Sequence, residues 1–147
     1  MIRSVLKNAD ENEKVRMAQK AVEIILMRQL ASYLAIPILL VDPAGNLLFY
    51  NEPAEALLGR RYGETDEIPL EEWSSIFELT AEDGSPIPLE ARPLIIALRK
   101  HQAVHGEFWI RGLDGVSKKI EATAFPLVGQ GGRHLGAVAI LWEQNHP

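Results

Sequence analysis

The chain has 147 residues, of which 47% are hydrophobic and 24% are charged, and it contains no cysteine. This balance is typical of one globular domain with a short extension. The net charge of −5, from 20 acidic and 15 basic residues, gives no attraction for phosphates and argues against nucleic-acid binding. The lack of cysteine excludes disulfides, thiolate metal sites, cysteine nucleophiles and thiol-bound chromophores.

The beginning of the chain is not typical of a secretory signal. Asp10, Glu11 and Glu13 interrupt it before any long apolar run. No window reaches the ~18 uncharged apolar residues that a membrane-spanning helix needs. We therefore expect a cytoplasmic protein that has neither a membrane nor a nucleic acid as its partner.

The first segment predicts an amphipathic helix from about Asn8 to Leu34, because it lacks glycine and proline and repeats apolar residues at helical spacing. Asp10 is its expected N-cap, with Glu13 three residues later, and Pro37 ends it. The apolar stripe of this helix can be covered by the domain's own sheet or by the same helix of a second chain. We expect a homodimer through the helix, and the two arrangements are compatible. The positions expected to face the second chain are Val15, Ala18, Val22 and Ile25.

Two short apolar runs, Ile38–Asp42 and Asn46–Tyr50, predict the strands of a hairpin. The turn between them contains proline and glycine, which favour a tight turn. Asn51 then caps a short helix that ends at Gly59. We expect the side chains of Asp42 and Asn51 to hold the turn and the strand-to-helix corner through hydrogen bonds to the backbone.

The second half of the chain predicts one longer helix and three strands. The stretch from Arg60 to Glu90 is rich in loops, with a helical turn or two around Trp73, and a helix follows at Pro93–Lys100. The three strands are expected at Glu107–Arg111, Lys118–Leu127 and His134–Trp142. The last of these is apolar at nearly every position, which places it at the centre of a sheet. Five strands with helices grouped between the second and third predict an α+β architecture.

These elements and their motifs resemble the Per-Arnt-Sim (PAS) family. The stretch from Asp42 to Gly59 is similar to the opening strand–turn–strand–helix block of that family. The residues that carry this block are Asp42, Gly45, Asn51 and Gly59, and we expect their roles to be structural. Further similarities lie at Asp83-Gly84, Pro93-Leu94, Ala97-Leu98-Arg99, Asp114-Gly115, Phe125-Pro126-Leu127 and Gly136-Ala137-Val138.

The resemblance covers about Leu34 to Glu143 and implies a PAS-like five-stranded antiparallel sheet with helices on one face, preceded by the N-terminal helix. Residues 1–34 are then a helical extension for dimerisation or signalling, and residues 35–147 are the sensory domain. Many family members continue from the last strand into an Asp-Ile-Thr sequence that starts an output helix, whereas this chain has Trp142-Glu143-Gln144. If the chain is complete, no effector domain follows, and if it is a piece, the effector is missing.

The resemblance also implies a pocket between the sheet and the helices, where family members hold haem, flavin, other chromophores or small metabolites. The inward positions that we expect to line it are Leu40, Phe49, Leu57, Trp73, Leu94, Leu98, Trp109 and Ile140. Each of them is equally suited to a filled core. Because no inward arginine or lysine is evident, with Arg92 and Arg111 reaching the rim at most, the sequence favours an apolar or planar ligand over a dianion.

The cofactors of the family can be tested against these residues. A flavin adduct needs a cysteine, which this chain lacks. Haem needs an axial ligand, and Pro93–Lys100 offers no histidine, so that His101 and His105 after it are weak candidates and haem is not expected. The same two histidines have a spacing that binds metal on a helix, but Gly106 follows at once and we expect no metal site. The sequence names no nucleophile or base, so we expect no enzyme.

The sequence therefore predicts a sensory or regulatory PAS domain for signal transduction. It would sense a small ligand or mediate a protein–protein interaction, and it would act on an effector domain or protein. A ligand-free dimerisation or scaffold module is the alternative, and a haem sensor is the weaker third possibility. The identity of the ligand, the stimulus and the effector cannot be read from the residues.

Overall fold

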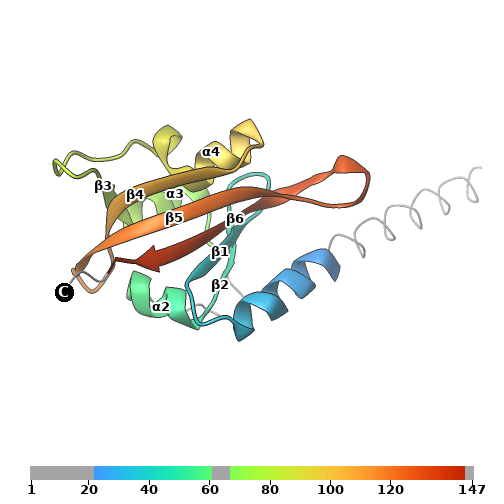
Figure 1. Cartoon of the computed structure of the whole chain (residues 1–147), viewed down its shortest axis with the longest axis horizontal. Coiled ribbons are helices and arrows are strands. Elements are labelled where there is room, and N and C mark those ends of the chain that lie inside the picture. The colour runs from blue at the N-terminus through green and yellow to red at the C-terminus, as the bar shows by residue number, and fades with distance from the viewer. Residues whose placement is uncertain (1–21, 61–66, 145–147) are drawn as a thin grey trace, which may run out of the picture.

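The two longest strands pair with each other at the centre of an antiparallel sheet (Figure 1). The computed structural model describes residues 22–60 and 67–144. The strands are β1 (Ile38–Val41), β2 (Leu47–Tyr50), β3 (Glu78–Thr80), β4 (Val104–Arg111), β5 (Ser117–Val128) and β6 (His134–Glu143). Their order in the sheet is β2-β1-β6-β5-β4-β3, and every neighbouring pair is antiparallel. As the apolar run of β6 predicts, that strand lies inside the sheet, between β1 and β5.

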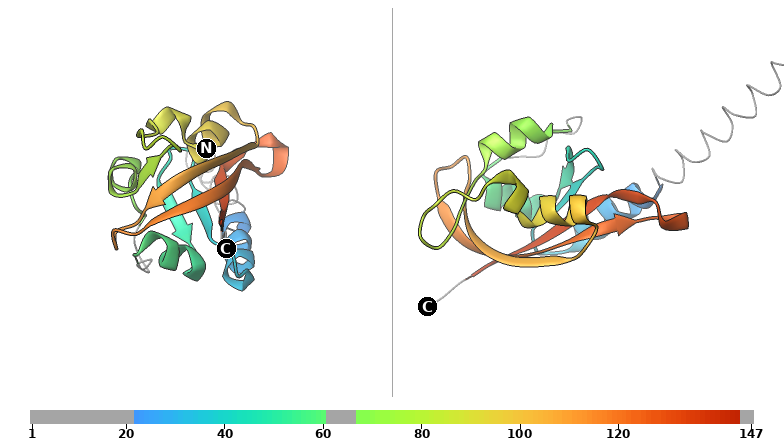
Figure 2. Two further views of the ribbon diagram at one scale, coloured as in Figure 1. Left: turned by 60° about the vertical axis from the view of Figure 1, so that its left-hand side comes forward. Right: turned by 90° about the horizontal axis from the view of Figure 1, so that it is seen from above.

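Helices lie on both faces of this sheet (Figure 2). Three of them, α2 (Glu52–Leu58), α3 (Leu70–Ile76) and α4 (Pro93–Lys100), pack on one face and bury the larger core. The N-terminal helix, described over residues 22–33, packs on the opposite face with Ile24, Met27 and Ala31. Single 3-10 turns, η1 (Leu89–Ala91) and η2 (Gln130–Gly132), precede α4 and β6.

The predicted architecture is confirmed as α+β with a curled antiparallel sheet, but the number of strands differs. The sheet has six strands and not five, because the short strand β3 pairs with β4 along Glu78–Thr80. The helices α2, α3 and α4 lie on one face as expected, and residues 22–33 cover the other face, which is one of the two arrangements expected for the N-terminal helix. The expected helical residues 8–21, with Val15 and Ala18, lie outside the described part of the chain.

The β1–β2 turn is stabilised by its own hydrogen bonds and by a hydrogen bond from α3. The carboxylate of Asp42 accepts hydrogen bonds from the backbone N–H groups of Ala44 and Asn46, both at 2.9 Å. Gly45 has a φ of 92°, a left-handed conformation that glycine adopts without strain. Its carbonyl accepts a hydrogen bond from the indole Nε1 of Trp73 at 2.8 Å. The turn therefore fixes the position of Trp73 in the core.

Adjacent residues of the central strands face different cores. Leu39 belongs to the core under α2, α3 and α4, whereas Leu40 belongs to the core under the N-terminal helix. On β6, Ala139 faces the first core and its neighbour Val138 faces the second. This follows from the alternation of side chains along a strand. The sheet is thus a single layer with packed helices on each side.

Candidate functional site

A small cavity lies between the sheet and the helices α2, α3 and α4. Its volume is about 60 Å³. Its lining residues come from the three helices and from β1, β3, β4, β5 and β6, and are Leu39, Leu58, Trp73, Phe77, Leu79, Arg92, Pro93, Leu94, Phe108, Ile110, Ala122, Ala139 and Leu141. This volume exceeds the about 10–15 Å³ that a cavity needs to hold one water molecule, so the cavity has room for a small group.

The cavity exists because the middle of the sheet presents small side chains. Ala122 of β5 and Ala139 of β6 form its floor, and both are buried. In the register of the sheet, Ala122 lies opposite Leu141, and Ala139 lies opposite a further alanine, Ala124. The methyl groups of these alanines are too small to fill the space between the sheet and the helices. Large side chains from the flanking elements, such as Trp73 and Phe108, close the sides instead.

Arg92 is the charged residue in this wall. It stands at the N-terminus of α4, and only 8% of its surface is exposed. Its Nη2 donates a hydrogen bond to the carbonyl of Ser74 in α3, at 3.1 Å. Burial lowers the pKa of Arg92, but a guanidinium still stays protonated in a protein. Arg92 therefore bridges α3 and α4, two of the three helices that border the cavity.

Asn51 connects this domain with the N-terminal helix. Its Nδ2 donates hydrogen bonds to the carbonyls of Ala31 at 2.9 Å and Ile36 at 2.8 Å. Its Oδ1 accepts from the backbone N–H of Ile38 at 3.0 Å and from that of Ala54 at 3.2 Å. One buried side chain thus joins the end of the N-terminal helix, the start of β1 and the first turn of α2.

Solved structures with this arrangement are PAS domains. One is from a protein of Colwellia psychrerythraea, 21% identical, with 82% of this chain and 97% of that chain aligned at a TM-score of 0.57. Another is from nitrogen regulation protein NR(II) of Vibrio parahaemolyticus, 18% identical, with 81% and 98% aligned at 0.55. A third is from the fruit-fly ELK potassium channel, 10% identical, with 84% and 98% aligned at 0.64. The chain has a PAS-type fold. No family model and no curated protein matches its sequence.

Four of the expected pocket residues lie on the cavity side of the PAS-type sheet. Trp73 and Leu94 line the cavity itself. Leu57 and Leu98 belong to the same buried core without lining the cavity. Leu57 instead borders a groove near the end of β6, together with Pro53 and Trp142.

The other four expected pocket residues lie on the opposite face. Leu40, Phe49 and Ile140 pack in the core under the N-terminal helix, where Phe49 also lies beneath the guanidinium of Arg28 at 4.9 Å. Trp109 alternates with Phe108 and Ile110, which line the cavity, so Trp109 is on the outer face. The expectation that these residues line the pocket is wrong.

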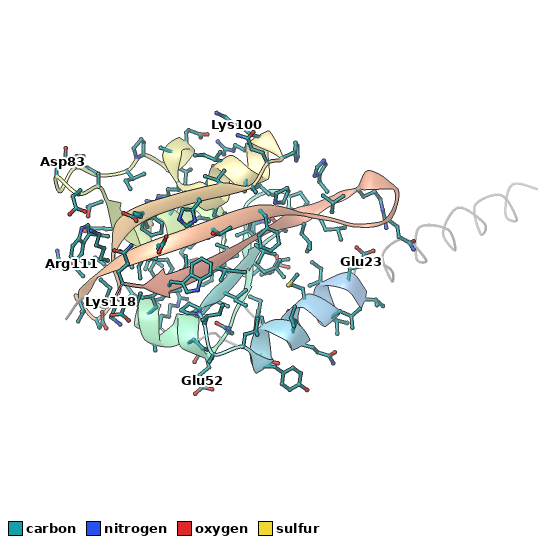
Figure 3. All side chains as sticks on the ribbon, in the orientation of Figure 1. Glu23, Glu52, Asp83, Lys100, Arg111 and Lys118 are labelled. Carbon is teal, nitrogen blue, oxygen red and sulfur yellow. The ribbon has the colours of Figure 1, made fainter. Side chains whose placement is uncertain are left out.

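Arg92 and Arg111 also differ from expectation. Arg92 lies in the cavity wall and not merely at the rim. Arg111, labelled in Figure 3 at the end of β4, is exposed and donates from Nε to the carbonyl of Gly115 at 3.3 Å. The position of Arg92 in the cavity wall could have been predicted from its place directly before Pro93. The residue that caps a helix packed on a sheet lies close to that sheet.

The three histidines in the described part of the chain lie away from the cavity. His101 ends α4 and stacks on His134, with 3.6 Å between the ring centroids. His105 is exposed, and its ring nitrogens contact Thr123 and Glu121, each at 2.9 Å. Neither His101 nor His105 lines the cavity, so neither is placed as an axial haem ligand there. Within residues 22–60 and 67–144, no three histidine, aspartate or glutamate side chains gather in a metal-binding cluster.

The N-terminal helix leaves an apolar face uncovered in the described structure. Val22 and Ile25, two of the expected dimer positions, are 52% and 51% exposed. Leu26 and Leu30 on the same helix are 58% and 54% exposed. The described helices include none long and apolar enough to cross a bilayer.

Proposed function

We propose that this PAS-type domain is a sensory module for signal transduction, which binds a small molecule in the cavity and passes the change to its N-terminal helix. It binds and transmits, and it catalyses no reaction. The observation that carries this proposal is the single-layer sheet between the cavity and the helix. Leu39 and Ala139 face the cavity, whereas their chain neighbours Leu40 and Val138 contact the core of the helix.

Close packing makes this layer a suitable transmitter. Protein interiors are packed as densely as organic crystals, so a core cannot absorb a new group without movement. A ligand that pushes on Ala139 moves β6, and Val138 moves with it under Ala31 of the helix. Asn51 adds a second connection, because its hydrogen bonds join the helix end to β1 and α2.

The output of the module in this proposal is a pair of N-terminal helices from two copies of the chain. The exposed apolar residues Val22, Ile25, Leu26 and Leu30 lie on the side of the helix that the sheet does not cover. Val22 and Ile25 continue the three-and-four spacing of Val15 and Ala18, which is the repeat of a two-stranded coiled coil. An exposed apolar stripe of this length favours association with an identical stripe.

The dimer is tested with the substitution Ile25→Glu in the full chain. A charge at a coiled-coil core position disfavours pairing, so sedimentation equilibrium is expected to find dimers for the unmodified chain and monomers for Ile25→Glu. The matched control is Leu113→Glu, since Leu113 is 52% exposed in the turn between β4 and β5. If Ile25→Glu remains as dimeric as Leu113→Glu, the helix is not the pairing surface.

The sensory role is tested by native mass spectrometry of the full chain after gentle purification. A retained small molecule supports sensing. A dimer that is purified without a bound small molecule, and that binds none of the small molecules added to it, supports the alternative of a ligand-free scaffold. An absorbance spectrum of the same sample decides on the haem alternative, because a Soret band would identify haem.

A further inference from the structure

The guanidinium of Arg92 is buried without a counter-ion among the described residues. Its Nη2 bonds to the Ser74 carbonyl, but Nε and Nη1 are buried and have no hydrogen-bond partner within residues 22–60 and 67–144. Arg60, Arg99, His105 and Lys119 form ion pairs in this part of the chain, whereas Arg92 forms none with the described residues. A buried charge without a partner is strongly disfavoured, so this arrangement calls for an anion.

The surroundings of Arg92 favour one negative charge and no more. Pro93 and Leu94, the first residues of α4, line the cavity beside Arg92. No described side chain caps the N-terminus of α4 and its first turn has no acidic residue, so the positive end of that helix dipole lies at the same place as Arg92. The remaining wall is aliphatic and aromatic, and a second ionised group there would be left unpaired.

The size of the cavity limits the anion. A volume of about 60 Å³ is small, so it favours a short ligand over a large one. The free nitrogens of Arg92 are covered in this structure, and the surface open to the cavity is apolar. Binding therefore requires the long side chain of Arg92 to turn toward the cavity, while the hydrocarbon part of the ligand contacts Leu94, Phe108 and their neighbours.

We propose that Arg92 binds the carboxylate of a short monocarboxylic acid whose hydrocarbon part fills the apolar cavity. The carboxylate accepts hydrogen bonds from the free nitrogens of the guanidinium, which is the donor best matched to a planar carboxylate. This inference rests on the proposed function, because it names the ligand class of the same cavity. Ligand binding would also change the structure around the cavity. When the side chain of Arg92 rotates toward the ligand, its contact with Ser74 of α3 changes.

The test compares propionate with propionamide, which has the same number of non-hydrogen atoms and no charge. Binding to the full chain is measured by two-dimensional amide NMR at up to about 10 mM of each probe, with sodium chloride matching the ionic strength. Propionate is expected to shift signals of residues around the cavity and to bind at least about tenfold more tightly than propionamide.

Two substitutions of Arg92 distinguish an effect of its charge on binding from an effect on folding. Arg92→Met removes the charge, keeps an unbranched apolar side chain, and is expected to weaken propionate binding by at least about tenfold, while propionamide binding stays within about twofold. Arg92→Lys keeps the charge and is expected to retain the preference for propionate. The control is Arg99→Met on the same helix, because Arg99 is exposed and bonds to Glu90; it should bind both probes as the unmodified chain does.

Each other outcome overturns the inference. If propionamide binds as well as propionate, the cavity accepts small molecules but Arg92 does not select an anion, and the proposed sensory function stands. If Arg92→Met binds propionate unchanged, the carboxylate lies elsewhere. If neither probe binds, the short-acid ligand is wrong, and the native mass spectrum then decides the sensory function separately.

Discussion

The side-chain amide of Asn51 donates a hydrogen bond to the carbonyl of Ala31 across 2.9 Å, and so joins two residues that are 20 positions apart in the chain. Ala31 lies in the last turn of the N-terminal helix, and its carbonyl also accepts a hydrogen bond from the backbone N–H of Leu34 at 3.2 Å. Asn51 also caps α2 and is 2% exposed. The helix end is therefore anchored by a residue of the domain and not only by apolar contacts.

The substitution Asn51→Ala is expected to reduce the free energy of unfolding by about 2–4 kcal/mol. It removes the N-cap of α2 and leaves the carbonyl of Ile36 and the N–H of Ile38 without their partner, and the carbonyl of Ala31 keeps only its bond from the N–H of Leu34. Urea unfolding measures the loss. Hydrogen exchange should also become faster in residues 22–36, where the helix end is released.

The control for Asn51 is Gln102→Ala, because Gln102 is exposed after α4. This change should alter stability by no more than about 0.5 kcal/mol. If Asn51→Ala costs as little as that, or leaves exchange in residues 22–36 unchanged, the amide is not the anchor of the helix.

Trp73→Phe is expected to cost about 1–3 kcal/mol of stability. The indole Nε1 donates to the carbonyl of Gly45 at 2.8 Å, and Trp73 is 5% exposed, so phenylalanine leaves a buried carbonyl unpaired and a small gap. Trp142→Phe is the comparison, because Trp142 is 39% exposed, and its cost should stay below about 0.5 kcal/mol. Equal costs in the two variants would contradict a structural role for the Trp73–Gly45 contact.

The sequence predicted best the elements that local chemistry determines. The proline- and glycine-containing turn after Asp42, the cap at Asn51 and the left-handed end at Gly59 each act within a few residues, and α2 lies between them as expected. The helix at Pro93–Lys100 has its predicted bounds for the same reason: a proline fits its first turn, and His101 ends it in a left-handed conformation.

The faces of the central strands could not be predicted in the same way. All four residues of β1 are buried, so no alternation of polar and apolar residues indicates that Leu40 faces the helix while Leu39 faces the cavity. The strand β3 escaped notice because it has only three residues and exists through its pairing with the distant strand β4. On β5, by contrast, Ile120, Ala122 and Ala124 alternate in the sequence with Lys119, Glu121 and Thr123, and this pattern indicates the buried face that the structure shows.

The loop at Asp83 provides a prediction about pH. The hydroxyl and the backbone N–H of Ser85 donate hydrogen bonds to the carboxylate of Asp83, and these bonds hold its pKa below the ordinary value of 3.8. A lowered folded-state pKa means that the stabilisation is present above the unfolded pKa and is lost as the pH falls through the folded one. Asp83 is fully exposed, so the effect is local (Figure 3).

The substitution Ser85→Ala removes the hydroxyl donor and is expected to raise the pKa of Asp83 toward 3.8. A carbon-detected NMR titration of the Asp83 carboxyl between about pH 2 and 6 measures this change directly. Ser32→Ala, on the distant N-terminal helix, should leave the titration unchanged. A titration of Asp83 that is the same with and without the Ser85 hydroxyl would assign the shift to the backbone alone.

Filling the cavity from the sheet side should reproduce part of the effect of a ligand. Ala139→Leu adds three carbon atoms at the cavity floor, in a space of about 60 Å³, and is expected to change stability by less than about 1.5 kcal/mol. The added side chain occupies the ligand's space and pushes on β6 beside Val138.

The variant is therefore expected to bind propionate at least about tenfold more weakly and to change hydrogen exchange in residues 22–36. Ala124→Leu on β5 is the matched control, because Ala124 is fully buried but does not line the cavity. Without free space, the same enlargement should cost about 1–3 kcal/mol through overpacking. If Ala139→Leu destabilises the domain as much as Ala124→Leu, the cavity cannot accept a group from the sheet. If it is tolerated but leaves exchange in residues 22–36 unchanged, the sheet does not transmit cavity occupancy to the helix.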